Sequence, residues 1–140
     1  MNTTFRKIYF IILAVVLVVP GTAWTEDISS PSEDPTLVKA VMCEFIQKLT
    51  PTNEAIVFSI DLGQVSCFTE FDPVPKQTVI YHKWHHKGRL IAVKQLTVNP
   101  PRWSSFSSIQ LRETDKGPWL VDVTDQNDKL LYTLRFSITD

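Results

Sequence analysis

The chain has 140 residues with 14 basic against 15 acidic side chains, and its formal net charge at pH 7 is −1. This length suits one domain of ordinary size. The balanced charge excludes the basic stripe of a nucleic-acid-binding protein and the polybasic run that anionic lipid attracts. The composition therefore predicts an ordinary soluble surface without nucleic acid as a partner.

Residues 1–23 predict a secretory signal peptide. Arg6 and Lys7 precede an apolar run at 8–19, and Pro20 follows it before small residues at Gly21 and Ala23. We expect cleavage after Ala23. The alternative is an uncleaved anchor, the only case in which the membrane would be a partner, but the run is shorter than the about 20 residues that cross a bilayer. In both cases we expect the remainder outside the cytoplasm, in the periplasm.

Residues 24–36 predict a flexible acidic tether, because they are polar and contain Pro31 and Pro35. A single folded domain is expected over residues 37–140. Residues 37–49 fit either a helix or a strand, and we favour a strand because the rest of the chain reads as β and needs a pairing partner there.

The second half of the chain alternates apolar and polar residues between short turn signals. Lys87-Gly88 predicts a hairpin turn, and Asn99-Pro100-Pro101 ends a strand because proline cannot donate to a ladder. The further expected strands cover residues 57–60, 65–71, 77–86, 89–98, 102–111, 117–124 and 130–138. In the last of them the alternation places Leu130, Tyr132, Leu134, Phe136 and Ile138 inward.

These strands predict an all-β domain. About seven short strands with regular turns are typical of an antiparallel β-sandwich of immunoglobulin-like architecture. A single open sheet could not cover both faces of the apolar stripes.

Cys43 and Cys67 are the only cysteines. An even count in an exported protein predicts a disulfide, and such a loop would stabilise the fold by about 3–4 kcal/mol. The alternative is a pair of buried free thiols.

Several short motifs together resemble an uncharacterised bacterial family, domain of unknown function 2914, over residues 38–139. The pieces are Phe58-Ser59-Ile60-Asp61-Leu62-Gly63 leading into Cys67-Phe68-Thr69, His82-x-Trp84 with Gly88, Pro101-Arg102-Trp103 with Ser107-Ser108, and Gly117-x-Trp119-x-Val121-x-Val123. The resemblance implies structural roles for His82, Trp84, Gly88 and Trp119, and it supports pairing of the two cysteines. The chain departs from the family at Ile109, where lysine is common, and at Lys87, where asparagine is common. The resemblance implies no activity.

Three histidines, His82, His85 and His86, suggest a metal site, but strand geometry argues against it. His85 and His86 point to opposite faces, and His82 and His86 are about 13 Å apart along a strand. A zinc ion needs its ligands within about 2.1 Å. We expect no metal and no cofactor, with His82 packed or hydrogen-bonded and His86 solvated.

The serines at 104, 105, 107 and 108 suggest a nucleophile. No nucleophile elbow surrounds them, and no carboxylate is marked to orient His82 as a base. We expect them to be solvent-facing or bulge residues, and we predict no catalytic residue.

Three aspartates near the end of the chain, Asp122, Asp125 and Asp128, suggest calcium. They lack the glycine-centred loop of an EF-hand, and turn formation explains Asp125 and Asp128 better.

Arg102-Trp103 is the candidate binding patch, because arginine and tryptophan are favoured at binding hot spots. The alternative is that Trp103 belongs to the core and Arg102 packs over it by a cation–π contact.

These observations predict an exported, non-catalytic binding module of the bacterial cell envelope whose partner is a protein or a polysaccharide. One alternative is a small metal-dependent or hydrolytic enzyme that uses His82 and residues 102–108. Another is a purely structural subunit of an envelope assembly.

Overall fold

The computed structural model describes Gly21 and residues 30–140. The predicted signal peptide and residues 24–29 of the predicted tether lie outside this description, apart from Gly21. Residues Pro31–Asp140 form one compact unit. Its secondary structure is β, with two short 3₁₀ turns and no α-helix among the described residues. Within this part of the chain, no helix has the length and apolar character to span a membrane.

Nine strands form in the described part of the chain. They are β1 (Leu37–Gln47), β2 (Thr50–Glu54), β3 (Val57–Ser59), β4 (Gln64–Phe71), β5 (Thr78–His86), β6 (Arg89–Val98), β7 (Trp103–Gln110), β8 (Gly117–Asp125) and β9 (Leu130–Thr139). The 3₁₀ turns are η1 (Ile60–Leu62) and η2 (Glu113–Asp115). Each of these strands overlaps a predicted one except β2, which the sequence did not predict. Lys48 and Leu49 adopt positive φ angles of 48° and 56°, so the chain reverses in a tight turn and pairs at once with β1.

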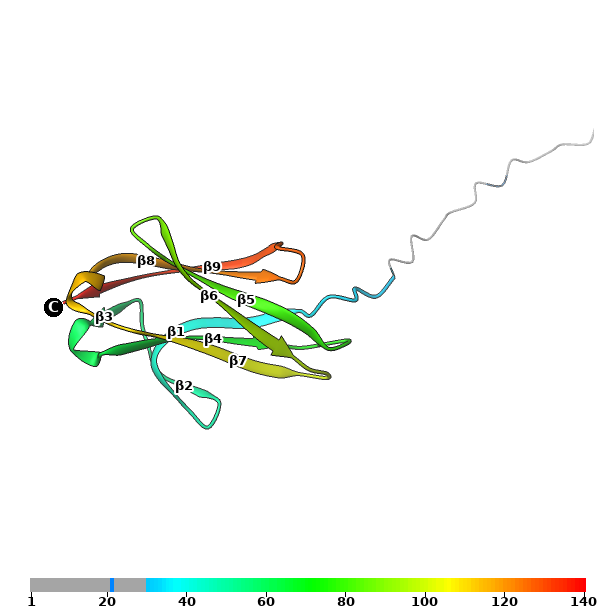
Figure 1. The fold of residues 1–140 in the computed structure, drawn as a ribbon. Coiled ribbons are helices and arrows are strands. Elements are labelled where there is room, and N and C mark those ends of the chain that lie inside the picture. Colours follow the sequence, from blue (N-terminus) through cyan, green and yellow to red (C-terminus); the bar gives the residue numbers. More distant parts are fainter. Residues whose placement is uncertain (1–20, 22–29) are drawn as a thin grey trace, which may run out of the picture. The chain divides into compact units, whose positions relative to one another are not determined.

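The strands form two sheets that face each other (Figure 1). The four-stranded sheet has the order β2-β1-β4-β7, and the five-stranded sheet has the order β3-β9-β8-β5-β6. Strands β1, β4 and β7 correspond to A, B and E of an immunoglobulin domain, and β5, β6, β8 and β9 correspond to C, C′, F and G. The predicted immunoglobulin-like sandwich is confirmed. All strand pairs are antiparallel except β3 with β9.

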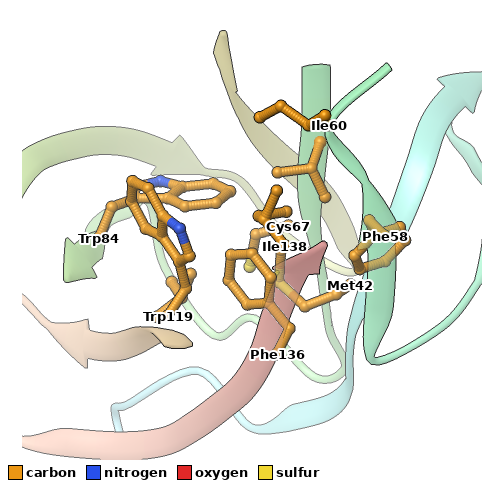
Figure 2. Close-up of a cluster of buried hydrophobic side chains, with 10 residues drawn as sticks. Met42, Phe58, Ile60, Cys67, Trp84, Trp119, Phe136 and Ile138 are labelled. Carbon is orange, nitrogen blue, oxygen red and sulfur yellow. The ribbon is translucent and has the colours of Figure 1, made fainter. Parts of the chain in front are cut away.

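The apolar core lies between the sheets in two clusters. The larger one, drawn in Figure 2, gathers Trp84, Trp119 and Phe136 around Cys67 and Met42. Phe136 stacks on Trp119 at 6.0 Å and meets the edge of Trp84 at 6.1 Å, the two arrangements that aromatic pairs prefer. The smaller cluster consists of Phe71, Val74, Ile80, Val98 and Val123.

The predicted inward face of the last strand is correct only in its second half. Phe136 and Ile138 are buried, and Leu134 packs against both clusters, whereas Leu130 and Tyr132 are exposed. The register between β8 and β9 shifts at Val123, and β3 covers β9 only from residue 137 onward. The first half of β9 is therefore an uncovered edge.

The predicted disulfide is wrong, since both cysteines are free and buried. In the β1–β4 pairing, Cys67 lies opposite Met42 and Cys43 lies opposite Ser66. Residues 42 and 43 are neighbours on a strand and point to opposite faces, so Cys67 points into the core and Cys43 points away from it. Two Cβ atoms on opposite faces of a sheet cannot be bridged without moving the backbone.

Cys67 also lacks the partner that an immunoglobulin domain would supply. There the second cysteine lies on strand F, over a buried tryptophan of strand C. Trp84 occupies the tryptophan position on β5, but the inward residues of β8 include Val121 and Val123. Burial raises the pKa of the Cys43 thiol to about 11 and raises that of Cys67 further. Both thiols therefore stay protonated and poorly reactive.

The end of the predicted tether is held against the domain. Pro35 is buried, the Thr36 N–H donates to the Pro73 carbonyl at 3.1 Å, and Glu33 pairs with Lys76 at 2.5 Å. Contacts with the folded domain thus begin before residue 37.

Both thiols should be free in the purified protein. Alkylation of the denatured, unreduced protein should modify Cys43 and Cys67, whereas the folded protein should react slowly because both side chains are buried. Peptide mass spectrometry checks this, and a crosslinked peptide joining the two residues would contradict the register.

Replacing Trp119 by alanine should destabilise the domain by about 3–5 kcal/mol, because the indole is buried between His86 and Phe136. Urea unfolding measures the change. Trp103→Ala is the matched control and should cost less than about 1 kcal/mol, since that indole is partly exposed. Equal losses in the two variants would be inconsistent with this core.

Candidate functional site

A chain of hydrogen bonds crosses the sandwich between the two sheets. His82 on β5 is fully buried, and its ring contacts two strands of the opposite sheet. Its Nδ1 lies 2.7 Å from Ser107 Oγ on β7, and its Nε2 lies 3.1 Å from Thr69 Oγ1 on β4. Trp84 Nε1 donates to the same Ser107 oxygen at 3.1 Å.

The donor and the acceptor of each of these hydrogen bonds can be assigned. Thr69 Oγ1 donates to the Ser105 carbonyl at 3.5 Å, because a carbonyl only accepts. His82 Nε2 therefore donates to Thr69, and the neutral ring accepts at Nδ1 from the Ser107 hydroxyl. The polar side-chain atoms of Trp84, Ser107, His82 and Thr69 all have partners, so burial of these four groups leaves none of their donors unsatisfied.

Burial lowers the pKa of His82 to about 4, because the charged imidazolium would be desolvated. Protonation would also place a hydrogen on Nδ1, which now accepts from Ser107. Both ring nitrogens of the buried His82 thus have hydrogen-bond partners.

The structure brings His82 and Ser107 together, as the hydrolase alternative required. The partner of Nε2 is the Thr69 hydroxyl and not a carboxylate, and Ser107 is itself nearly buried. Both side chains lie between the sheets, where His82 has no exposed surface and Ser107 is 7% exposed. Of the other serines, Ser108 bonds Ser66 at 2.6 Å, and Ser105 supplies the carbonyl above.

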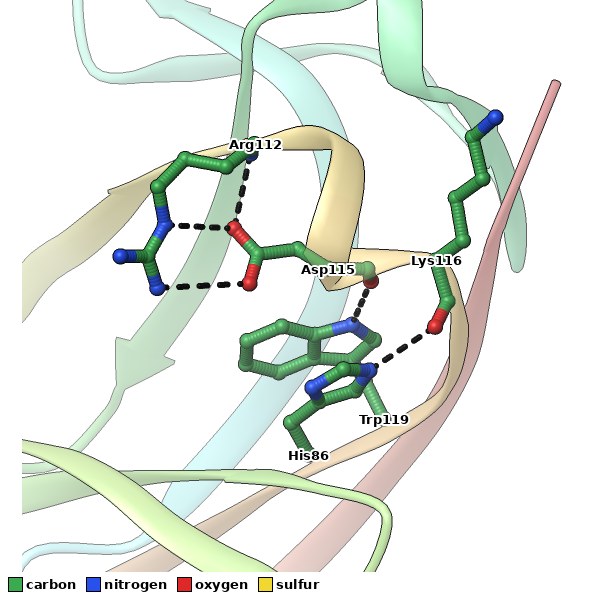
Figure 3. Close-up of polar contacts among 5 residues, drawn as sticks. All are labelled: His86, Arg112, Asp115, Lys116 and Trp119. Atoms are coloured by element: carbon green, nitrogen blue, oxygen red, sulfur yellow. Dashed lines mark hydrogen bonds and ion pairs between the residues drawn. The ribbon is translucent and has the colours of Figure 1, made fainter.

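His86 is half-buried and held by specific contacts, whereas the sequence predicted a solvated side chain. Its ring stacks on Trp119 with centroids 4.4 Å apart, and Nε2–H donates to the Lys116 carbonyl at 2.9 Å (Figure 3). Trp119 Nε1 donates to the Asp115 carbonyl at 2.7 Å, and the Asp115 carboxylate accepts from the Arg112 backbone at 2.7 Å. The η2 turn thus locks both rings in place.

The three aspartates are occupied by protein partners. Asp125 accepts from the backbone N–H groups of Asn127 and Lys129, which is the predicted turn role. Asp128 pairs with Lys83, and Asp122 accepts from Thr133 at 2.5 Å. No group of three metal-ligating side chains is found within the part of the chain that the structure describes.

Arg102 and Trp103 lie at the start of β7 and border a groove. Trp103 is 38% exposed, and the Arg102 guanidinium pairs with Glu70 on β4. The groove has a volume of about 390 Å³ and is lined by Leu49, Arg102, Trp103 and Ser104. Leu49 belongs to the β1–β2 turn, so the groove lies between that hairpin and β7. We refer to these four residues as the hairpin–β7 groove.

Large apolar side chains are exposed on the strands beside the groove. Phe106 follows Ser104 on the same face of β7 and is 42% exposed, and Leu49 is 57% exposed. Phe45, on β1 of the same hairpin, is also exposed. The sequence singled out only Arg102 and Trp103. Leu49 was missed because its position depends on the β1–β2 turn.

The comparison with protein families matches residues 77–138 to a family described as a protein of unknown function, DUF2914. This part of the chain resembles the DUF2914 family. The match extends from the start of β5 to nearly the end of β9 and includes His82, Trp84, Gly88, Trp103 and Trp119. The motif pieces at residues 58–69 and both cysteines lie outside it. No curated protein matches the chain. The description of the family names no activity.

Acidification should destabilise the domain through His82. Between pH 6.5 and about 4 the unfolded chain binds a proton that the folded histidine does not, so stability is full above pH 6.5 and falls as the pH drops toward 4. A pKa unit corresponds to about 1.4 kcal/mol, and the loss should be on the order of 3 kcal/mol.

Urea unfolding of the wild type and of His82→Gln at several pH values measures this contribution. The variant should have a flatter stability profile in that interval, and His85→Gln serves as the control because His85 lies on the outer face of β5. A wild-type slope that persists in His82→Gln would contradict the assignment.

Proposed function

We propose that this protein is an exported, non-catalytic binding module of the bacterial cell envelope, and that it holds a partner protein in the hairpin–β7 groove. The main support for this proposal is a groove lined in part by the partly exposed Trp103. Monomeric domains seldom leave tryptophan at the surface beside other large apolar groups without a binding role.

The chemistry of the groove favours a protein over a polysaccharide. Leu49 and Trp103 offer aliphatic and aromatic surface in the groove, and the exposed Phe106 on β7 adds to it beside the groove, which suits apolar side chains of a partner. The charge of Arg102 is balanced by Glu70, so the groove presents a neutral rim. A polysaccharide site would need more hydrogen-bonding groups around the tryptophan than Arg102 and Ser104 provide.

Export is supported by the N-terminal sequence. The positive start at Arg6 and Lys7, the apolar run and the small residues before position 24 have the order of a secretory signal. An envelope location would place the groove among surface and periplasmic proteins.

A hydrolytic function is the second candidate, because the Ser107 hydroxyl lies within hydrogen-bonding distance of His82 Nδ1. The binding role is preferred, since a substrate would have to reach two side chains that are buried between the sheets. Hydrolysis would also require Ser107 to release its bond from Trp84.

Photo-crosslinking in the native host tests the binding role. A photoreactive phenylalanine analogue in place of Phe106 should give a discrete crosslinked protein. The same analogue in place of Lys94, which is exposed on the other sheet, should give none. A crosslinked product that is polysaccharide would contradict the assignment of a protein partner.

Affinity measurements with the captured protein then locate the site. Trp103→Ala should weaken binding by at least about tenfold, which corresponds to about 1.4 kcal/mol. Tyr132→Ala removes a comparably exposed aromatic ring from the five-stranded sheet and should change the affinity by less than about twofold. Equal effects of the two substitutions would place the site elsewhere.

A further inference from the structure

A second cavity lies on the outer face of the five-stranded sheet, and its wall is rich in cationic groups. Its volume is about 250 Å³. His85, Lys87 and Arg135 contribute its basic side chains, and Pro118 and Leu120 its apolar ones. It shares no lining residue with the hairpin–β7 groove.

Strand register explains why the basic groups meet. His85 on β5 lies opposite Leu120 on β8, and Leu120 lies opposite Arg135 on β9. Residues directly opposite one another on a sheet share a face, so the three side chains form one row across three strands. Lys87 joins this row from the β5–β6 turn, where its N–H donates to the Pro118 carbonyl at 3.0 Å.

The charges of Lys87 and Arg135 are not neutralised by the protein. Neither residue forms an ion pair within the described residues, and no carboxylate lines the cavity. The other nearby lysines differ, because Lys83 pairs with Asp128 and Lys116 pairs with Glu113 and Asp140. In a chain with a net negative charge, two unpaired cations at one cavity form a local positive potential.

Two of the basic side chains are held in position before any ligand arrives. His85 Nδ1–H donates to the Lys83 carbonyl at 3.1 Å, which orients the ring at the cavity wall. Nε2 is then the acceptor nitrogen, so the donors for an anion come from Lys87 and Arg135. Lys87 lies across Gly117, where an added Cβ would come within 3.0 Å of Lys87 Cε. Glycine at 117 therefore allows the lysine to lie back over β8. Preorganised donors lose less entropy when an anion binds.

We propose that this cavity binds an anionic group, a carboxylate or a phosphate, carried by a ligand of sugar size. Lys87 and Arg135 would bind the anion by charge-assisted hydrogen bonds, and Pro118 and Leu120 would contact the rest of the ligand. All of the lining residues fall within the segment that resembles the DUF2914 family. The site lies on the opposite sheet from the proposed partner groove, so either proposal can fail without the other.

Titration of the ¹⁵N-labelled full chain tests the proposal, with glucuronate and inorganic phosphate as probes and glucose as the neutral analogue of glucuronate. Saturable chemical-shift changes are expected at the amides of His85, Lys87 and Arg135 with at least one of the two anions, and not with glucose. Shifts of equal size with glucose and glucuronate would show that charge does not determine binding, and would overturn the proposal. The absence of saturable shifts with both anions would do the same.

A pair of charge-matched double variants separates a built site from general attraction of anions. Lys87→Gln/Arg135→Gln should weaken binding of the anion by at least about tenfold. Lys48→Gln/Lys94→Gln removes the same number of unpaired surface charges away from the cavity and should leave the affinity nearly unchanged. Equal weakening in both double variants would overturn the proposal. Trp103→Ala should have no effect on anion binding.

Discussion

The hydrogen-bond chain from Trp84 through Ser107 and His82 to Thr69 is the constraint on which the rest of the sandwich depends. It joins β5 of one sheet to β4 and β7 of the other. Apolar side chains tolerate small shifts of one sheet over another, because dispersion and burial have no direction. A buried hydrogen bond does not tolerate such a shift, because the displaced donor loses its partner. Leaving a buried donor unpaired destabilises the fold by about 1–3 kcal/mol. These hydrogen bonds therefore fix how the two sheets are aligned.

This alignment also decides what the outer surfaces display. With Ser105 and Ser107 held inward, the alternate residues Ser104 and Phe106 of β7 must face outward beside the β1–β2 hairpin. On the other sheet, inward Trp84 makes its neighbour His85 face outward in line with Arg135. The interior is filled by packed apolar side chains and by the neutral ring of His82. The groups that could recognise a ligand lie on the two outer faces.

The two outer faces differ in chemistry. The hairpin–β7 groove combines exposed apolar groups with an arginine that is already paired, whereas the cavity near Lys87 combines a small apolar wall with two unpaired cations. The first suits the apolar side chains of a protein, and the second suits an anion. A domain of this size thus has room for two distinct recognition surfaces on one rigid sandwich.

The sequence alone determined the features that depend on local patterns. Alternation and turn residues predicted the strands from β4 onward and the sandwich they form, because strand periodicity and proline or glycine turns act over a few residues. The tertiary structure decided everything that depends on register. The pairing of β1 with β4 put Cys43 and Cys67 on opposite faces, a shift between β8 and β9 left Tyr132 exposed, and the meeting of the sheets brought Ser107 to His82. Register is set by contacts between residues far apart in the chain, and moving a strand by one residue exchanges its two faces.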